Sequence, residues 1–331
     1  MDRVYLLREV VHSCIVEVIG VPFDLCGRKP GSRLGPAAVR LANLEGAMSA
    51  IGVTITHDED IAGPACTPEA KGLKNFGPAL ECVQNLRARV LQALQRGGTP
   101  LVIGGDHFIA AGSVAAALEV YGGDLALIWI DAHADLNTPA GSPSGNLHGM
   151  PFAALLGLPS STNAVEDKQW KELEAALVPR NKLQQNRSAW LGIRELDREE
   201  QETISNLEGR FAATMYDIDR YGIVECVQKF DHWLREAGAK KLWISFDVDV
   251  LDPQLAPGTG TAVRGGLTYR EMHIVGEVLH QFLTMPNCPY SLVGLDLVEI
   301  NPLNDTNNIT ALTAVEWVAS LFGKGILGPL R

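Results

Sequence analysis

Carboxylate and imidazole side chains gather at three separate points of the sequence, each after a short apolar run. The six residues are His107, Asp131, His133, Asp135, Asp247 and Asp249. The apolar runs 100–103, 125–130 and 242–246 are typical of strands buried on both faces of a sheet. Because open parallel sheets bind ligands at the carboxyl ends of their strands, we expect these side chains to form one site. The alternative for any single cluster is a surface turn, in which Asp and Gly are common.

The spacing of Asp131, His133 and Asp135 supports the interpretation as a site. Alternate residues of a strand point to the same face, so these three side chains share one side if the extended geometry continues beyond residue 130. A helix would spread the same spacing around its circumference. We therefore expect two carboxylates and an imidazole to converge where this strand leaves the core.

The donor set suggests two metal ions. Two imidazoles and four carboxylates are too many ligands for one tetrahedral ion, but they fit two ions that share bridging carboxylates. Because no thiolate takes part, the oxygen-rich set favours manganese over structural zinc. Four carboxylates offset about four positive charges from two divalent ions, and a hydroxide between the ions would be matched by a cationic substrate.

The composition narrows the class of protein. Lys and Arg total 28 against 39 Asp and Glu, a net charge of −11, which argues against nucleic-acid or membrane partners. No apolar stretch approaches the roughly 20 residues of a membrane span, and residues 1–13 make a poor signal peptide. The six cysteines lack CxxC spacing and are expected to be reduced, mostly buried thiols. We expect a cytoplasmic protein.

Apolar patterns predict alternating strands and helices along the chain. The expected strands are 15–20, 53–56, 100–103, 125–130, 188–193, 211–215, 242–246 and 292–295. The expected helices are a short one within 1–13, then 36–51, 78–95, 110–121, about 168–177, 223–237, 269–283 and 306–322. This alternation predicts an α/β fold with a mainly parallel sheet covered on both faces. No repeat or composition break divides the chain, so we expect a single domain over residues 1–331.

Five motifs give the sequence a family resemblance. They are 104–107 (GGDH), 131–135 (DAHAD), 144–149 (SGNLHG), 245–249 (SFDVD) and 265–271 (GGLTYRE). Together they resemble the ureohydrolase family from about residue 18 to 322, and within that family the arginases. The resemblance implies a three-layer α/β/α sandwich around an eight-stranded parallel sheet. It also implies a homo-oligomer, usually a trimer and in some cases a hexamer.

The resemblance further implies hydrolysis of L-arginine to L-ornithine and urea in arginine metabolism, including the urea cycle. Two manganese ions per subunit and a bridging hydroxide would carry out the reaction. One ion would be held by His107, Asp131, Asp135 and Asp247, and the other by Asp131, His133, Asp247 and Asp249. Asp131 and Asp247 would then bridge the two ions.

Three residues receive catalytic roles from the resemblance. Asp135 would accept a hydrogen bond from the hydroxide and pass its proton to the leaving amine, His148 would shuttle protons, and Glu299 would orient the guanidinium. His148 could instead be a loop histidine and Glu299 a solvated carboxylate. Trp129 is expected in the core, from where its indole N–H could also donate to a ligand carboxylate.

The substrate preference would depend on residues that contact the far end of the substrate. By resemblance, Asn137, Ser144 and Asn146 contact the α-carboxylate, Asp197 and Glu200 face the α-amino group, and Thr261 lies near the guanidinium. Agmatinases lack the arrangement around residues 137–146, which makes an agmatinase or another guanidino-acid ureohydrolase the second hypothesis. A third hypothesis is a non-catalytic homologue with a binding or regulatory role.

Overall fold

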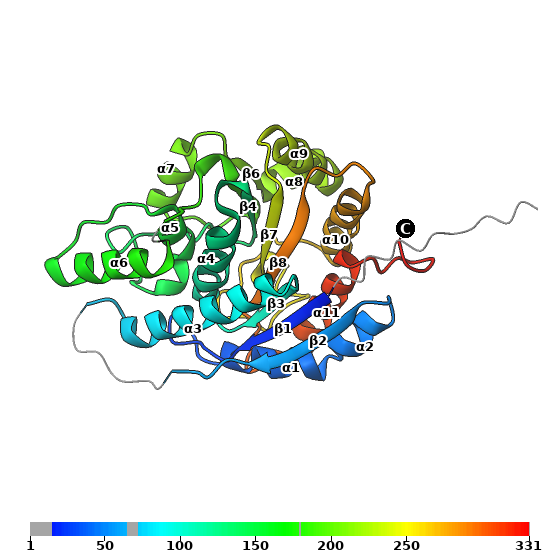
Figure 1. Cartoon of the computed structure of the whole chain (residues 1–331), viewed down its shortest axis with the longest axis horizontal. Coiled ribbons are helices and arrows are strands. Elements are labelled where there is room, and N and C mark those ends of the chain that lie inside the picture. Colours follow the sequence, from blue (N-terminus) through cyan, green and yellow to red (C-terminus); the bar gives the residue numbers. More distant parts are fainter. Residues whose placement is uncertain (1–14, 65–71, 179, 331) are drawn as a thin grey trace, which may run out of the picture.

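The computed structural model describes residues 15–64, 72–178 and 180–330 and contains one sheet whose neighbouring strands are all parallel. Its eight strands lie in the order β2-β1-β3-β8-β7-β4-β5-β6 (Figure 1). They are β1 (Ile15–Val21), β2 (Thr54–Asp60), β3 (Thr99–Gly104), β4 (Leu125–Ile130), β5 (Ser188–Ile193), β6 (Phe211–Thr214), β7 (Lys241–Asp247) and β8 (Ser291–Val298). The predicted parallel α/β sheet is confirmed.

Helices cover both faces of the sheet and make it the middle of three layers (Figure 1). One face packs against α3 (Phe76–Gln95), α4 (Ala110–Tyr121), α5 (Pro151–Leu156), α6 (Ala164–Leu177) and α7 (Arg198–Asn206). The other packs against α1 (Gly35–Leu41), α2 (Leu44–Ser49), α8 (Met215–Tyr221), α9 (Ile223–Glu236), α10 (Tyr269–Thr284) and α11 (Ile309–Leu321).

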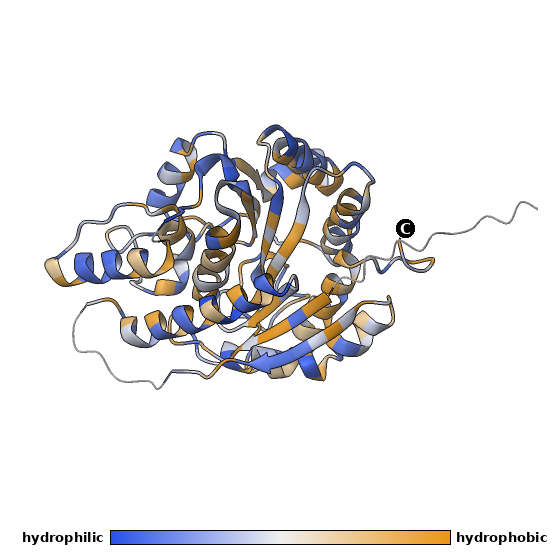
Figure 2. Cartoon of the chain, in the orientation of Figure 1, coloured by the Kyte–Doolittle hydropathy of each residue, from blue (hydrophilic) through white to orange (hydrophobic). Residues whose placement is uncertain are grey.

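The period of two in the strands explains this layering. In β4, Leu127 and Trp129 join the core on the α4 side, whereas Ile128 and Ile130 join the core on the α11 side. Every residue of β4 is buried. Figure 2 shows the contrast between the apolar central strands and the hydrophilic outer faces of the helices. A strand that is apolar on both faces is stable only between two layers of helices.

The strand order gathers the site residues in one place. Strands β3, β8, β7 and β4 are consecutive neighbours, although they come from distant parts of the chain. Their carboxyl ends lead into the segments with His107, Glu299, Asp247 and Asp131. The fold therefore brings together four segments that the sequence predicts to be functional.

The single helix predicted over 36–51 is wrong, because Asn43 divides it into α1 and α2. Asn43 adopts a left-handed backbone with φ 63°, and its Oδ1 accepts a hydrogen bond from Gly46 N at 3.2 Å. Asn tolerates this conformation and caps helices well. The apolar period of α1 and α2 runs through the break, which is why the pattern alone did not reveal it.

Other boundaries also differ from the predictions. Strand β2 continues to Asp60, where a loop was expected from residue 58, because β2 lies at the sheet edge with charged side chains exposed. The short helices α5, α7 and α8 had no predicted counterpart. The helix expected within 1–13 and part of the loop expected over 58–77 lie outside the described residues.

Four cysteines of the described residues, Cys26, Cys82, Cys226 and Cys288, are free thiols, as expected. The described residues include no helix that is long and apolar enough to span a membrane.

Glu17 on β1 is a buried charge whose contribution to the stability of the fold can be measured. It is 1% exposed, and Arg96 Nη2 and Arg89 Nη1 lie 2.5 Å and 3.3 Å from its Oε2. Burial alone would raise the pKa of Glu17, but the two arginines outweigh it and hold the pKa below 4.5. We expect Glu17→Gln to lower the free energy of unfolding by about 1–3 kcal/mol at pH 7, since it leaves the arginines without their counter-charge.

The sign of the pH dependence follows from the lowered pKa. The stabilisation by Glu17 is present above the unfolded pKa, near 4.5, and is lost as the pH falls through the folded value. Urea unfolding should therefore show a smaller difference between wild type and variant at pH 4 than at pH 7. Glu172→Gln, on the exposed face of α6, is the control and should change the stability by less than about 0.5 kcal/mol.

Candidate active site

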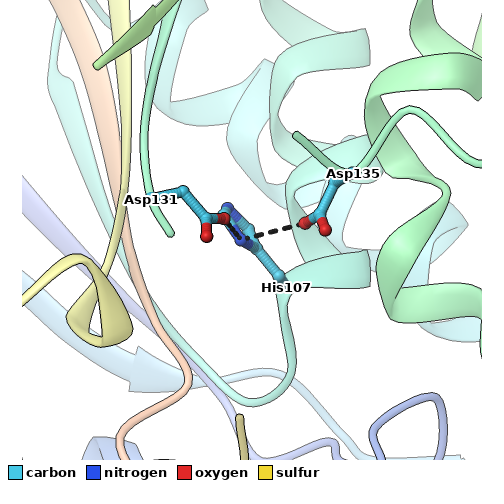
Figure 3. A group of neighbouring side chains, drawn as sticks. All are labelled: His107, Asp131 and Asp135. Carbon is cyan, nitrogen blue, oxygen red and sulfur yellow. Dashed lines mark ion pairs between the residues drawn. The ribbon is translucent and has the colours of Figure 1, made fainter. Parts of the chain in front are cut away.

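His107 stands at the centre of the first group of predicted ligands. Its Nδ1 lies 2.9 Å from Asp131 Oδ2, 3.2 Å from Asp135 Oδ2 and 3.2 Å from Asp247 Oδ2. Figure 3 shows the Asp131 and Asp135 carboxylates directed at the His107 imidazole, with dashed lines for the two ion pairs. All four residues are buried. These four side chains are the ones predicted to hold the first ion.

A second group adjoins the first. His133 Nδ1 lies 3.3 Å from Asp131 Oδ1 and 3.2 Å from Asp249 Oδ2. Asp131 thus presents one carboxylate oxygen to each group, the arrangement expected of a bridging ligand. Asp247 directs Oδ2 toward the first group, while its Oδ1 accepts a hydrogen bond from Asp249 N at 2.8 Å. A bridging role for Asp247 stays a prediction.

The extended geometry expected over residues 131–135 is wrong. Strand β4 ends at Ile130, and the chain then bends, with Asp135 in a left-handed backbone of φ 52°. The side chains converge through this bend instead of along one strand face. A non-glycine residue at positive φ is uncommon, and such conformations cluster at functional sites.

Neighbouring elements hold the bend by its backbone. Arg194 N donates to Ala132 O, the Trp190 indole N–H donates to Ala134 O, and Phe152 N donates to Asp135 O, at 2.8, 3.1 and 3.1 Å. Strand β5 and helix α5 thereby determine where Asp135 lies. The period of hydrophobic residues in 131–135 contains no sign of these contacts, which come from residues more than 15 positions away.

The ring of His107 is fixed on two sides. Its Nε2 lies 2.9 Å from Ser245 Oγ, which leaves Nδ1 to face the carboxylates. The ring stacks on Trp129, with centroids 3.8 Å apart and an angle of 6° between the planes. Trp129 is buried, as expected, but its indole N–H has no hydrogen-bond partner among the described residues. The core position expected for Trp129 is confirmed, and among the described residues it contacts His107 by stacking and not by the additional donation to a carboxylate that the sequence left open.

The electrostatics of the cluster fit metal ions. Burial raises the pKa of Asp135 and of Asp247 well above the usual range, and neighbouring carboxylates raise both further. The pKa of Asp131 is lowered despite its burial, because His107 and His133 lie against it. His107 Nδ1 and Asp131 Oδ2 face each other, yet neither has a hydrogen-bond partner among the described residues. Buried acceptors without donors that point at one place are what a cation would satisfy.

His148 and Glu299 form a pair beside this cluster. His148 Nδ1 lies 3.0 Å from Glu299 Oε1, which also accepts a hydrogen bond from His107 N at 3.0 Å. Burial lowers the pKa of His148, but the hydrogen bond and charge of Glu299 outweigh it and raise the pKa above 6.5. Glu299 is 3% exposed and has a left-handed backbone, φ 62°. These contacts disfavour both alternatives, a simple loop histidine and a solvated carboxylate.

A cavity of about 230 Å³ opens above the cluster. All six residues expected to contact the substrate line it, together with His148. The six are Asn137, Ser144, Asn146, Asp197, Glu200 and Thr261. The fold thus brings them together around one space.

Several of these residues also support one another. Asn137 Nδ2 donates to Asp197 Oδ2 at 2.9 Å, which leaves the buried Asn137 Oδ1 without a partner. Glu200 is buried and accepts hydrogen bonds from Asp197 N and Leu136 N, and burial raises its pKa to about 7. Thr261 Oγ1 donates to Asp249 Oδ2 at 2.7 Å. Glu200 therefore connects the start of α7 to the loop that follows β4, and Thr261 orients Asp249, a predicted metal ligand.

Sequence reasoning did not single out three residues that the structure shows to matter. Arg28 lines the cavity from the loop after β1, and Ser245 is the polar residue in an otherwise apolar run. Arg194 directly follows β5 and donates to the carbonyls of Asp249 and Val263 at 2.7 and 2.8 Å. A polar side chain within or directly after a buried strand was the available signal for Ser245 and Arg194, whereas Arg28 lies seven residues beyond β1 and had no such signal.

Comparison with known proteins agrees with the geometry. The sequence model of the Arginase family matches residues 15–323. An arginase of Staphylococcus aureus (strain COL) is 38% identical over 317 residues, which cover 94% of this chain and 98% of that protein. The chain belongs to the arginase family. Crystal structures of arginases from Bacillus subtilis subsp. subtilis str. 168 and Bacillus caldovelox match it at TM-scores of 0.84 and 0.83, each with 36% identity over 94% of this chain and 99% of the other.

Membership of the arginase family confirms the resemblance found in the sequence and the fold that it implied. It also makes the protein a hydrolase that acts on a guanidino C–N bond, which disfavours the hypothesis of a non-catalytic homologue. The arginase family is metal-dependent, in agreement with the two groups of His and Asp side chains.

Ser245 offers a test of how the ligand ring is oriented. We expect Ser245→Ala to weaken binding of a divalent metal about tenfold, because loss of a hydrogen bond behind a histidine ligand frees the ring. Titration of the metal-free protein in the presence of a competing chelator measures this affinity. Ser291→Ala is the control, since Ser291 contacts Lys241 at the opposite end of β8. Unchanged affinity in Ser245→Ala would show that Trp129 stacking alone fixes the ring.

Proposed function

We propose that this arginase-family hydrolase converts L-arginine to L-ornithine and urea with two manganese ions per subunit. The observation that carries the proposal is the sharing of Asp131 by two ligand groups at the floor of a cavity lined by Asn137, Ser144 and Asn146. The relatives named arginases support the choice of substrate. Assembly as a trimer or hexamer, a cytoplasmic location and a single domain stay predictions.

The residues that would hold the ions are the six predicted ligands. His107, Asp131, Asp135 and Asp247 would serve one ion, and His133, Asp131, Asp249 and Asp247 the other. The harder oxygen donors and the lack of thiolates support manganese. When bound, the two ions supply a water whose pKa is low enough to ionise near neutral pH.

The chain's own residues would then handle protons and orientation. Asp135 lies within the ligand cluster and borders the cavity, so its second oxygen is suited to accept a proton and pass it to the leaving amine. His148 borders the same cavity, and its hydrogen bond with Glu299 stabilises the protonated ring. Glu299 would orient the guanidinium by its negative charge. His148 could take up a proton at the cavity and release it to solvent, because the imidazole titrates near neutral pH.

The opposite end of the cavity would recognise the amino-acid part of the substrate. Asn137 and Asn146 carry amide N–H groups and Ser144 carries a hydroxyl, and all of these can donate hydrogen bonds into the cavity that the three residues line. These amide and hydroxyl groups suit the α-carboxylate, and Asp197 suits the α-amino group. Agmatine lacks the carboxylate, so an enzyme for agmatine would have no use for these groups. This consideration favours arginase over agmatinase activity.

A comparison of L-arginine and agmatine tests the proposal. After loading with manganese and measurement of the bound metal, we expect urea release from L-arginine with a kcat/KM at least about a hundredfold above that for agmatine, because each orphaned polar contact costs roughly 1–3 kcal/mol. Asn137→Ala should lower the value for L-arginine far more than that for agmatine. Equal turnover of the two substrates by the wild type would contradict the arginase assignment and leave a two-metal hydrolase of other preference.

His148→Asn tests the proton-transfer role. The neutral ring is the form that accepts a proton, and its pKa is raised, so wild-type turnover should increase with pH from neutral into the alkaline range. The variant should keep its manganese and its KM but lose turnover by about 10²-fold or more, as is usual for removal of a general acid–base group. Loss of metal from the variant, measured by elemental analysis, would instead mark His148 as a ligand or a structural residue.

A further inference from the structure

The catalytic cavity has an uneven distribution of charge. Its lining includes five carboxylates, whereas Arg28 is the one Lys or Arg side chain among the lining residues; the carboxylates are those of Asp135, Glu195, Asp197, Glu200 and Asp247. A second cation, Lys74, lies behind the loop 142–146, where its Nζ donates to Ser144 O and, at 3.2 Å, to Asn146 Oδ1. L-Arginine has the matching polarity, with a cationic guanidinium at one end and a carboxylate at the other.

The backbone around Arg28 is held in place. Cys26 N and Gly27 N both donate to the buried Asp106 Oδ2, at 2.8 and 3.1 Å. Cys26 O accepts a hydrogen bond from His148 N at 3.3 Å, which ties this loop to the His148 segment. Arg28 therefore projects from an anchored loop next to a residue of the proposed active site.

The guanidinium of Arg28 makes no contact with a counter-charge that would stabilise the fold among the described residues. Other arginines have counter-charges, such as Arg40 with Asp58 and Arg96 with Glu17. Arg28 has no ion pair or side-chain hydrogen bond among the described residues, although Glu195 borders the same cavity. A free guanidinium at the mouth of a substrate cavity is suited to bidentate binding of a carboxylate.

We propose that Arg28 binds the α-carboxylate of the substrate and restricts this enzyme to guanidines that carry a carboxylate. The inference rests on the proposed function and adds to it a specificity residue beyond Asn137, Ser144 and Asn146. Lys74 acts through the loop by holding Ser144 and Asn146 in place, whereas Arg28 supplies the charge that the carboxylate contacts.

A second cavity, of about 510 Å³, adjoins the first and shares Arg28, His133, Glu195 and Thr261 with it. It adds two further cations, Lys29 and Arg264, that do not line the catalytic cavity. Lys29 is therefore the matched control for Arg28, since it is the next residue, is exposed and has the same charge. A general effect of positive charge near the mouth would involve both residues, but contact with the substrate carboxylate would involve Arg28 alone.

The experiment measures binding, so that it does not depend on turnover. Isothermal titration of the manganese-loaded protein compares L-ornithine with putrescine, which is ornithine without the carboxylate. In Arg28→Ala we expect the Kd of L-ornithine to rise about tenfold, because one charge-assisted contact with its carboxylate is lost. The Kd of putrescine, which has no carboxylate, should change less than about twofold. Arg28→Lys should recover part of the affinity, and Lys29→Ala should change either Kd by less than about twofold.

Steady-state kinetics provide the second readout. Arg28→Ala should raise the KM for L-arginine about tenfold with little change in kcat, because the contact is made equally in the ground state and the transition state. An equal change for ornithine and putrescine, or an equal effect of Lys29→Ala, would overturn the assignment of Arg28. Absence of urea release from L-arginine by the wild type would refute the proposed function, while the binding comparison would still decide the role of Arg28.

Discussion

The burial of several like charges in one place is the constraint on which the rest of the site depends. Asp131, Asp135, Asp247 and Asp249 are each 7% exposed or less and lie within a few ångströms of two histidines. Removing an isolated carboxylate from water is very costly unless opposite charge or hydrogen bonds compensate. The surrounding fold therefore has to supply donors to these side chains and leave room for cations between them.

The cost of burying these carboxylates is offset in the same way in three of them. In each, a backbone N–H group donates a hydrogen bond to one of the two carboxylate oxygens. Asp131 Oδ1 accepts from His133 N, Asp247 Oδ1 from Asp249 N, and Asp249 Oδ1 from Ala132 N. The other oxygens of Asp131 and Asp247 face His107, and that of Asp249 faces His133. Because these donors belong to the loops that carry the ligands, the shape of the loops and the orientation of the ligands depend on each other. Asp135 and Glu299 have left-handed backbones, and each accepts a separate hydrogen bond, Asp135 O from Phe152 N and Glu299 Oε1 from His107 N.

The sequence was most informative where a pattern is local. Apolar runs such as 125–130 located the buried strands, and the polar residues after them located the ligands, because side-chain alternation and strand ends are visible in a few consecutive residues. The bend at Asp135 depends on donors from Phe152 and Trp190, and the orientation of His107 depends on Ser245, so neither could be found locally. Asn43 interrupts a helix whose apolar period continues, and Arg28 lies in a loop without any period.

The position of β8 has a consequence for how this molecule is made. β8 (Ser291–Val298) lies between β3 and β7, yet it follows both in the chain. Until it is inserted, the strand before His107 has no hydrogen-bonded connection to the strands before Asp131 and Asp247. Strand β8 therefore joins two groups of strands, β2-β1-β3, which leads to His107, and β7-β4-β5-β6, which leads to the other five predicted ligands. Truncation before Ser291 would remove this strand and the backbone hydrogen bonds that connect the strand before His107 to the strand that ends in Asp247.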